Sequence, residues 1–257
     1  MLPRDSVSEA IRNASSRGRP ALVAFMTAGF PSRGRFIADL LKVGEVADLI
    51  EIGLPFSDPM ADGMTIQRSS RIALANGVTL DWVIKELAAL ANRPRAPLLL
   101  MSYLNPLLAH GIDRLVVDAR AAGISGFIVP DLPFEECAEF RAALNGAGIA
   151  LVQMVTPITP PARLAMLARE SEGFVYAVTM TGTTGRDVAV PDAVLDYLDL
   201  VRSSAVVPVC AGFGIRNRDQ VTRLTGHSDG VIVGSALVEV LERGEDPAKF
   251  LRGLRGN

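Results

Sequence analysis

Short apolar runs alternate with amphipathic segments along most of the chain. The runs are continuous and rich in β-branched residues, which is typical of strands in a parallel sheet that is buried on both faces. The sequence predicts strands at Leu22–Thr27, Leu49–Ile52, Pro97–Met101, Gly126–Val129, Ala150–Val155, Phe174–Val178, Val207–Cys210 and Gly230–Val233. The intervening segments carry apolar residues at helical spacing, which predicts helices at Arg35–Val46, Leu80–Ala91, Ile112–Ala122, Phe134–Gly146, Pro161–Arg169, Asp192–Ser203, Asn217–Leu224 and Ser235–Leu241.

The spacing of these runs indicates the architecture. The first run begins at Leu22 and the eighth at Gly230, so a strand and a helix recur about every 30 residues, as in a (β/α)8 barrel of ~250 residues. Ser6–Ser16 also has helical spacing and precedes the first strand. No linker, low-complexity segment or block of charge divides the chain. We therefore expect an α/β fold, a single (β/α)8 TIM barrel domain over residues 1–257 with an extra N-terminal helix.

The connections that follow the second and sixth predicted strands are longer than the others. They are Pro55–Gly63 and Thr179–Val190. Loops after the strands form the functional rim of such a barrel. Long loops on a scaffold of short connections commonly act as lids or as partner contacts.

Glu51 interrupts the apolar second strand between Ile50 and Ile52. A carboxylate is expensive to bury unless it is paired or its environment uses it. One explanation is a salt-bridged strand residue, and the other is a catalytic acid that faces the barrel interior. Asp58 and Asp62 follow in the next loop, where they either cap turns or join Glu51 in a site.

Glycines cluster after the seventh and eighth strands, which is the usual phosphate site of these barrels. Gly212 and Gly214 let backbone N–H groups approach an anion, and Gly234 and Ser235 open a helix whose N-terminus favours negative charge. The alternative is that these glycines only make tight turns. We expect Glu51 to lie across the barrel mouth from this phosphate end.

Composition narrows the choice of partner. The chain has 26 Lys and Arg against 28 Asp and Glu, a formal net charge of −2. Balanced charge disfavours a nucleic-acid or membrane-surface partner, so we expect a small-molecule substrate. The first twenty residues lack an apolar signal region and no run approaches the length of a membrane span. These features predict a soluble cytoplasmic protein.

Residue types also narrow the chemistry. The three lysines all fall in segments of helical spacing, so a Schiff-base lysine at a strand end is not expected. The chain has two histidines, and its two cysteines, Cys137 and Cys210, form no CxxC pair. We therefore expect no metal site and no disulfide framework. Carboxylate chemistry is the remaining possibility for an enzyme.

Six motifs, in their order and spacing, resemble the α subunit of tryptophan synthase: IEIGLPFSDPMADGMTIQ, LNPLLAHGID, FIVPDLPFEE, GFVYAVTMTGTTG, AGFGI and VIVGSA. The similarity covers essentially the whole chain. The resemblance implies a lyase that cleaves indole-3-glycerol phosphate to indole and glyceraldehyde 3-phosphate in L-tryptophan biosynthesis. It also implies an αββα complex in which indole passes to a β subunit that holds pyridoxal phosphate, while this chain holds no cofactor.

The resemblance assigns roles to individual residues. Glu51 matches the general acid and base, Asp62 the residue that holds the indole N–H, and Tyr176 the tyrosine beside the catalytic acid. For Glu51 to act near neutral pH, its apolar surroundings must raise its pKa. The other matches are indole-pocket walls at Phe25, Ile66, Tyr103 and Phe213, phosphate ligands at Gly185, Gly214, Gly234 and Ser235, the loop-closure residue Thr184, and partner contacts at Pro55, Asp58 and Pro59.

Two positions depart from the family pattern, and three other functions remain open. Met64 stands where Pro is common after ADG, and Ala211 where a polar or bulkier residue is frequent before GFG. The alternatives are a stand-alone lyase that releases free indole, a silent subunit that only activates a β partner, and another phosphate-binding barrel such as an isomerase. A silent subunit would not need both Glu51 and Asp62, and the isomerase would carry another acid pair or a lysine at a strand end.

Overall fold

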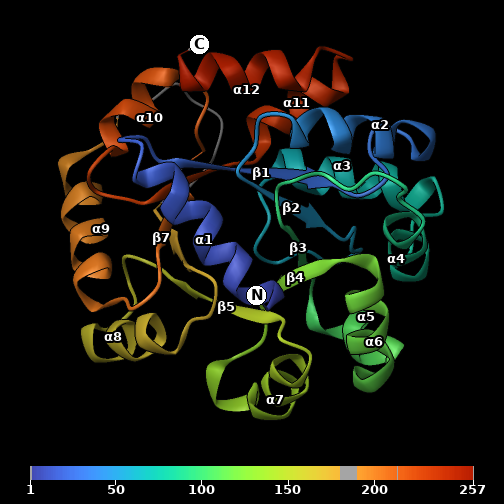
Figure 1. Ribbon diagram of the computed structural model, residues 1–257, viewed down its shortest axis with the longest axis horizontal. Helices are drawn as coiled ribbons and strands as arrows, with labels where there is room; N and C mark the ends of the chain where they lie inside the picture. Colours follow the sequence, from blue (N-terminus) through green and yellow to red (C-terminus); the bar gives the residue numbers. More distant parts are fainter. Residues whose placement is uncertain (1, 180–189, 213, 257) are drawn as a thin grey trace.

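Parallel strands form a closed barrel at the centre of the molecule (Figure 1). The computed structural model describes residues 2–179, 190–212 and 214–256. Within these ranges, eight strands pair in chain order, and the last pairs with the first. They are β1 Ala21–Thr27, β2 Leu49–Gly53, β3 Leu98–Met101, β4 Ile124–Ile128, β5 Ala150–Val155, β6 Val175–Val178, β7 Val209–Gly212 and β8 Gly230–Val233. The predicted TIM barrel is confirmed.

Helices surround the barrel and one helix crosses its end (Figure 1). The helices are α1 Pro3–Ser15, α2 Arg33–Gly44, α3 Met64–Ala75, α4 Leu80–Ala88, α5 Leu104–His110, α6 Ile112–Ala122, α7 Ala138–Gly146, α8 Pro161–Glu170, α9 Asp192–Ser204, α10 Arg218–Leu224, α11 Ser235–Glu242 and α12 Pro247–Arg255, with a 3₁₀ turn η1 at Phe134–Glu136. The extra N-terminal helix is confirmed as α1. The sequence pattern does not predict α3, α5 and α12.

The helix α3 buries two serines on the face that packs inward, which interrupts the apolar spacing that would predict it. It buries Ser69, Ser70 and Ala73 against the barrel, and the Ser69 hydroxyl lies 2.6 Å from that of Thr27 at the end of β1. The polar helix is thus held partly by hydrogen bonds, which hydrophobic periodicity does not detect. The start of α12 did carry a sequence signal, because Asp is a favoured residue at the position before a helix. In the structure, the Asp246 side chain accepts hydrogen bonds from the backbone N–H groups of the first turn.

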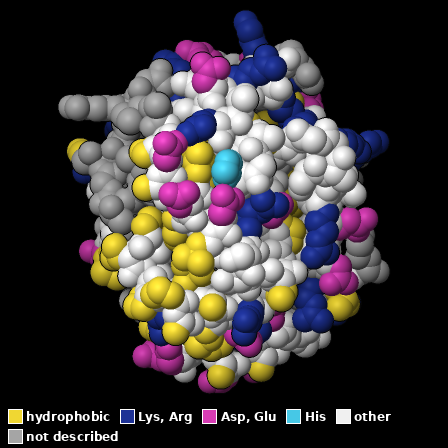
Figure 2. Space-filling model, turned by 90° about the vertical axis from the view of Figure 1, so that its left-hand side faces the viewer, with side chains coloured by type: hydrophobic (Ala, Val, Ile, Leu, Met, Phe, Trp, Pro, Cys, Tyr) yellow, Lys and Arg dark blue, Asp and Glu magenta, His cyan; other side chains and the backbone are white. Residues whose placement is uncertain are grey.

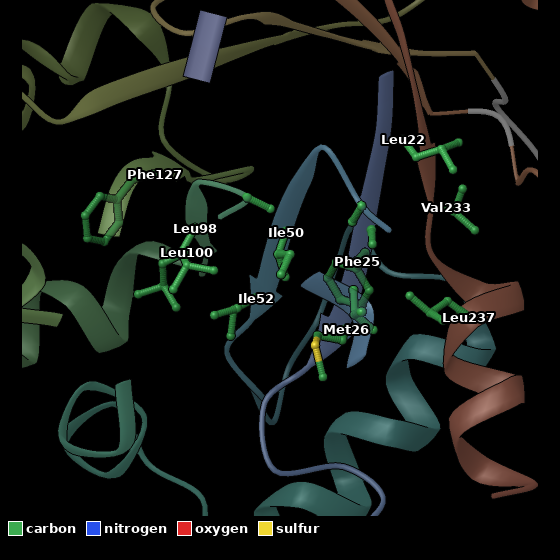
Figure 3. Close-up of a cluster of buried hydrophobic side chains, with 14 of the residues drawn as sticks. Leu22, Phe25, Met26, Ile50, Ile52, Leu98, Leu100, Phe127, Val233 and Leu237 are labelled. Atoms are coloured by element: carbon green, nitrogen blue, oxygen red, sulfur yellow. The ribbon is translucent and has the colours of Figure 1, made fainter. Parts of the chain in front are cut away.

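Side chains of the strands point alternately to the helices and to the barrel interior. The outward set includes Leu22, Ile50, Ile52, Leu98 and Leu100, which are at most 3% exposed and pack with the helix layer. Figure 3 shows this layer from β1 to β3 with Leu237 of α11 beside it. Fully burying each such side chain contributes about 1.5–3 kcal/mol.

The amino-terminal end of the barrel is closed by α1, which lies across it in Figure 1. Val7, Ile11 and Ala14 of this helix form an apolar cluster with interior residues of the strands, including Val23 and Leu49. Since this end is packed with apolar side chains, a substrate can enter only at the opposite rim, where the strands end.

The surface carries mixed charge. Figure 2 shows acidic and basic side chains interspersed over the face on the left of Figure 1. In the described part of the chain, no helix is long and apolar enough to cross a membrane.

Candidate active site

Glu51 occupies an interior position of β2. It pairs in register with Phe25 of β1 and Leu99 of β3, and it shares its face of the strand with Leu49, which belongs to the interior cluster. Its side chain is 0% exposed, and neither carboxylate oxygen has a hydrogen-bond partner among the described residues. Within the described part of the chain, Glu51 therefore has no salt bridge that would explain its burial.

Burial decides the protonation of Glu51. Loss of water around the carboxylate, together with the nearby negative charge of Asp62, raises the pKa of Glu51 to about 8. The carboxyl group is therefore mostly protonated at neutral pH, in agreement with the expected shift. A protonated acid that lacks a structural partner is available to donate its proton.

Asp62 is held by Tyr103. The Tyr103 hydroxyl donates a hydrogen bond to Oδ2 of Asp62 over 3.2 Å and accepts one from the backbone N–H of Ala61 over 2.9 Å. The Tyr103 ring also stacks on Phe56, with ring centroids 4.9 Å apart. Burial raises the pKa of Asp62, and the Tyr103 hydrogen bond opposes that rise. The second acid is thus fixed at the end of its loop.

A cavity of about 190 Å³ opens at the carboxyl ends of the strands and contains both acids. Its acidic wall holds Glu51 and Asp62, and its apolar wall includes Phe25, Ile66 and Met101. The remaining lining residues are Ala61, Gly63, Met154, Tyr176, Val178, Gly212, Gly214, Ile232, Gly234 and Ser235. The cavity thus combines an apolar slot with two carboxyl groups and a glycine-rich end.

Tyr176 reaches the cavity because its neighbour has no side chain. It pairs with Cys210 in β7, and a Cβ on Gly212 would lie 2.8 Å from its ring and 3.1 Å from its hydroxyl oxygen. Gly212 therefore leaves the space that the Tyr176 ring fills. Burial and the charge of Glu51 hold the pKa of Tyr176 well above its usual range, so its hydroxyl stays protonated.

The glycine-rich end is built from β7 and β8. Gly214 has φ of +73°, which favours glycine, and Gly234 precedes the first residue of α11, Ser235. Only β1 lies between β2 and β8 in the barrel. Our expectation that Glu51 lies across the mouth from this end is therefore wrong, because barrel closure places strands that are distant in sequence near one another.

The structure brings most of the predicted site residues together. Phe25 and Ile66 line the cavity, while Tyr103 lines a smaller pocket beside it with Asp62. Phe213, Thr184 and Gly185 lie outside the described residues. Sequence reasoning missed four apolar strand residues that line the cavity, Met101, Met154, Val178 and Ile232. Alternation along the strands could have found them, since they fall on interior positions.

The predicted partner contacts differ in exposure. Asp58 is exposed, Pro59 is partly exposed and Pro55 is buried. Pro55 can therefore influence a partner only through the path of the loop. Two nearby apolar side chains that were not predicted as contacts are largely exposed, Met60 at 82% and Met64 at 81%.

One departure from expectation concerns the end of a strand, and a separate observation concerns metal chemistry. Ala211 and Gly212 belong to β7 and not to the following loop, and Ala211 is fully buried. Among the residues that the structure describes, no group of three or more His, Cys, Asp and Glu could hold a metal ion.

Comparison with known proteins places the chain in a family. Residues 11–254 match the family model described as tryptophan synthase alpha chain. The chain belongs to the tryptophan synthase alpha chain family. It is a lyase of L-tryptophan biosynthesis, the α subunit that cleaves indole-3-glycerol phosphate to indole and glyceraldehyde 3-phosphate.

Individual relatives agree with this membership. The alpha chain of Nitratidesulfovibrio vulgaris (strain DP4) is 45% identical over 94% of this chain and 95% of its own length. That of Geobacter sulfurreducens is 42% identical over 92% of each chain. A chain of the Pyrococcus furiosus tryptophan synthase a2b2 complex superimposes with a TM-score of 0.87 at 35% identity, over 93% of this chain and 99% of that chain. A chain of Mycobacterium tuberculosis tryptophan synthase superimposes with a TM-score of 0.87 at 32% identity, over 97% of this chain and 98% of that chain.

Proposed function

We propose that Glu51 is the general acid and base of the cleavage reaction. The observation that carries this proposal is a fully buried carboxyl group without a hydrogen-bond partner in the described residues, in the cavity that also holds Asp62. Carbon 3 of indole is a poor leaving group until it is protonated. Glu51, with its pKa raised to about 8, donates that proton and forms the indolenine.

The same carboxylate then serves as the base. It takes the proton from the glycerol hydroxyl next to the indole, and the bond between indole carbon 3 and the glycerol carbon breaks. The bonding electrons return to the ring, which yields indole, while the glycerol carbon becomes the aldehyde of glyceraldehyde 3-phosphate. Neither a Schiff base nor a metal ion takes part in these two proton transfers.

Asp62 is proposed to stabilise the charged indole ring, and Tyr176 to donate a hydrogen bond beside Glu51. Asp62 accepts a hydrogen bond from the indole N–H and stabilises the positive charge that forms on the ring after protonation. Its hydrogen bond from Tyr103 supports this role by fixing the carboxylate. Tyr176 keeps its proton, because its pKa is raised, and lies beside Glu51 as a neutral hydrogen-bond donor.

The substrate phosphate is assigned to the end of the cavity formed by Gly214, Gly234 and Ser235. The N-terminus of α11 points its first backbone N–H groups and the positive end of the helix dipole toward this end of the cavity, as helix N-termini do at anion sites. Roles for Thr184 in loop closure, Gly185 at the phosphate and Phe213 at the indole rest on the sequence motifs alone.

We also infer that this α chain works in an αββα complex in the cytoplasm with a β subunit that holds pyridoxal phosphate. The similar Pyrococcus furiosus chain comes from a tryptophan synthase a2b2 complex. The exposed apolar side chains of Met60 and Met64 and the exposed Asp58 support a contact at the second loop.

Indole release from indole-3-glycerol phosphate, measured with the chain alone and with added β subunit, tests this function. We expect slow release from the chain alone and faster release in the complex. High activity that added β subunit leaves unchanged would favour the stand-alone lyase. Release in neither condition would favour the silent activating subunit.

A further inference from the structure

A carboxylate outside the cavity joins three of the segments that line it. Oε1 and Oε2 of Glu239 accept hydrogen bonds from both terminal nitrogens of Arg216, at 2.8 and 2.9 Å. The Thr65 hydroxyl donates a longer bond of 3.4 Å to Oε1. We call Thr65, Arg216 and Glu239 the Glu239 cluster.

Each member of the Glu239 cluster is close in the chain to a residue of the cavity. Glu239 lies one helical turn after Ser235 on α11. Arg216 follows Gly214 by two residues, and Thr65 follows Asp62 by three. The cluster therefore ties both segments of the proposed phosphate site to the helix that begins beside the second acid.

The Glu239 cluster is better protected from water than an ordinary surface ion pair. The side chains of Arg216 and Glu239 are 26% and 24% exposed. The backbone N–H of Arg216 also donates to Oε1 of Gln220 over 2.7 Å, inside the capping box of α10. With both its backbone and its guanidinium fixed, Arg216 presents a bidentate and well-oriented partner to Glu239.

We propose that Glu239 is a positioning residue that fixes the phosphate-binding segments relative to Asp62. The inference rests on the proposed phosphate site at Gly214, Gly234 and Ser235. Because the Arg216–Glu239 pair joins the Gly214 segment to α11, its loss lets the two sides of the phosphate site move apart, which weakens phosphate binding and, to a smaller extent, misplaces the reacting carbon relative to Glu51 and Asp62. Glu239 itself touches neither the substrate nor the reacting atoms.

A matched control for Glu239 lies one helical turn further along α3 and α11. Arg68 of α3 makes a bidentate ion pair with Glu242 of α11, with N–O distances of 3.0 and 2.6 Å. This pair also joins α3 to α11, but, among the described residues, neither of the two bonds to a loop that lines the cavity. A role limited to holding α3 against α11 would make the two glutamates equivalent.

The test compares Glu239→Gln with Glu242→Gln in steady-state cleavage of indole-3-glycerol phosphate and in binding of glycerol 3-phosphate. For Glu239→Gln we expect KM and the dissociation constant of glycerol 3-phosphate to rise roughly tenfold, with a smaller change in kcat. Glu242→Gln should change both by less than about twofold. Equal effects of the two variants, or an unchanged KM in Glu239→Gln, would overturn the inference.

A third variant separates this inference from the proposed phosphate site. Ser235→Asp places a negative charge at the N-terminus of α11, which should abolish binding of glycerol 3-phosphate. If Ser235→Asp binds this ligand as tightly as the wild type, the proposed phosphate site is wrong. If Ser235→Asp loses binding while Glu239→Gln retains it, only the positioning role of Glu239 is wrong.

Discussion

Two acids only three residues apart lie in opposite environments: Asp48 directly before β2 and Glu51 in the middle of that strand. Asp48 precedes β2 at the closed end of the barrel and accepts hydrogen bonds from Arg19, Arg255 and the backbone N–H of Leu22. Burial alone would raise the pKa of Asp48, but these partners outweigh it and the pKa is lowered. Glu51 is more deeply buried and has no such partner among the described residues, so its pKa is raised to about 8.

The difference separates a structural acid from a functional one. Asp48 stays ionised and joins α12 to the first two strands through its arginines, which stabilises the fold. In its proposed role, Glu51 gives up that stabilisation and keeps its proton for the reaction. Burying an acid that has no hydrogen-bond partner among the described residues costs free energy, and we infer that this cost is tolerated because the proposed reaction takes its proton from Glu51.

Removing the acid at the open end should have the largest effect. Glu51→Gln keeps the size of the side chain but cannot transfer a proton, so we expect cleavage to fall by about 10²–10⁴-fold. Indole release by the purified variant measures this effect, and circular dichroism checks that the fold is intact. Wild-type turnover in Glu51→Gln would remove the acid and base role.

The same substitution should stabilise the protein at alkaline pH. Because the folded carboxyl group binds its proton more tightly than the unfolded one, raising the pH from 4.5 to about 8 favours unfolding of the wild type. Glu51→Gln does not lose stability in this way, so at pH 9 its free energy of unfolding should exceed that of the wild type by on the order of 5 kcal/mol. Urea titrations of both proteins at acidic and alkaline pH measure the difference. No gain at alkaline pH would contradict the unpaired state of Glu51.

Substitution of the acid at the closed end of the barrel should lower stability and leave the cleavage rate unchanged. Asp48→Asn removes the charge that Arg19 and Arg255 share, and should lower the free energy of unfolding by about 2 kcal/mol at neutral pH. Since the pKa of Asp48 is lowered from 3.8, the difference from the wild type should shrink as the pH falls below that value. The kcat of the folded variant should stay unchanged. A large loss of kcat with unchanged stability would reverse the roles assigned to the two ends.

The smallest expected effect on stability concerns the first residue of a helix, which differs between α12 at the closed end of the barrel and α3 at the open rim. The helix α12, which carries Arg255, begins with Pro247, whereas α3 at the rim begins with the exposed Met64. Proline is favoured at the first helical position, so Met64→Pro should raise the free energy of unfolding by about 0.5 kcal/mol. Thermal unfolding measures this gain. A clear loss of stability would show that the loop before α3 cannot accept proline.

The fold was predictable because its signal repeats. Continuous apolar strands and amphipathic helices recur at a regular interval, so errors at single boundaries, such as the two-residue shift of β7, did not change the count. The helix α3 was missed because it buries Ser69 and Ser70 rather than an apolar stripe. Composition and hydropathy do not register a helix held partly by a hydroxyl contact with Thr27.

The site was only partly predictable. Glu51 was identifiable as an acid in an apolar strand, but its neighbours along the chain do not show that it has no hydrogen-bond partner among the described residues. That fact depends on which side chains the closed barrel brings to it. The link from Tyr103 to Asp62 and the Glu239 cluster join residues that are 41 and 174 positions apart, and sequence periodicity does not register such pairs.

The most direct test of the central claim is the titration of Glu51 itself. The infrared difference spectrum between wild type and Glu51→Gln, recorded from about pH 4 to pH 10, isolates the carboxyl band of this side chain. A protonated carboxyl band that persists at neutral pH and disappears with a midpoint of about 8 is the predicted result. Loss of that band near the ordinary glutamate value of 4.5 would contradict it.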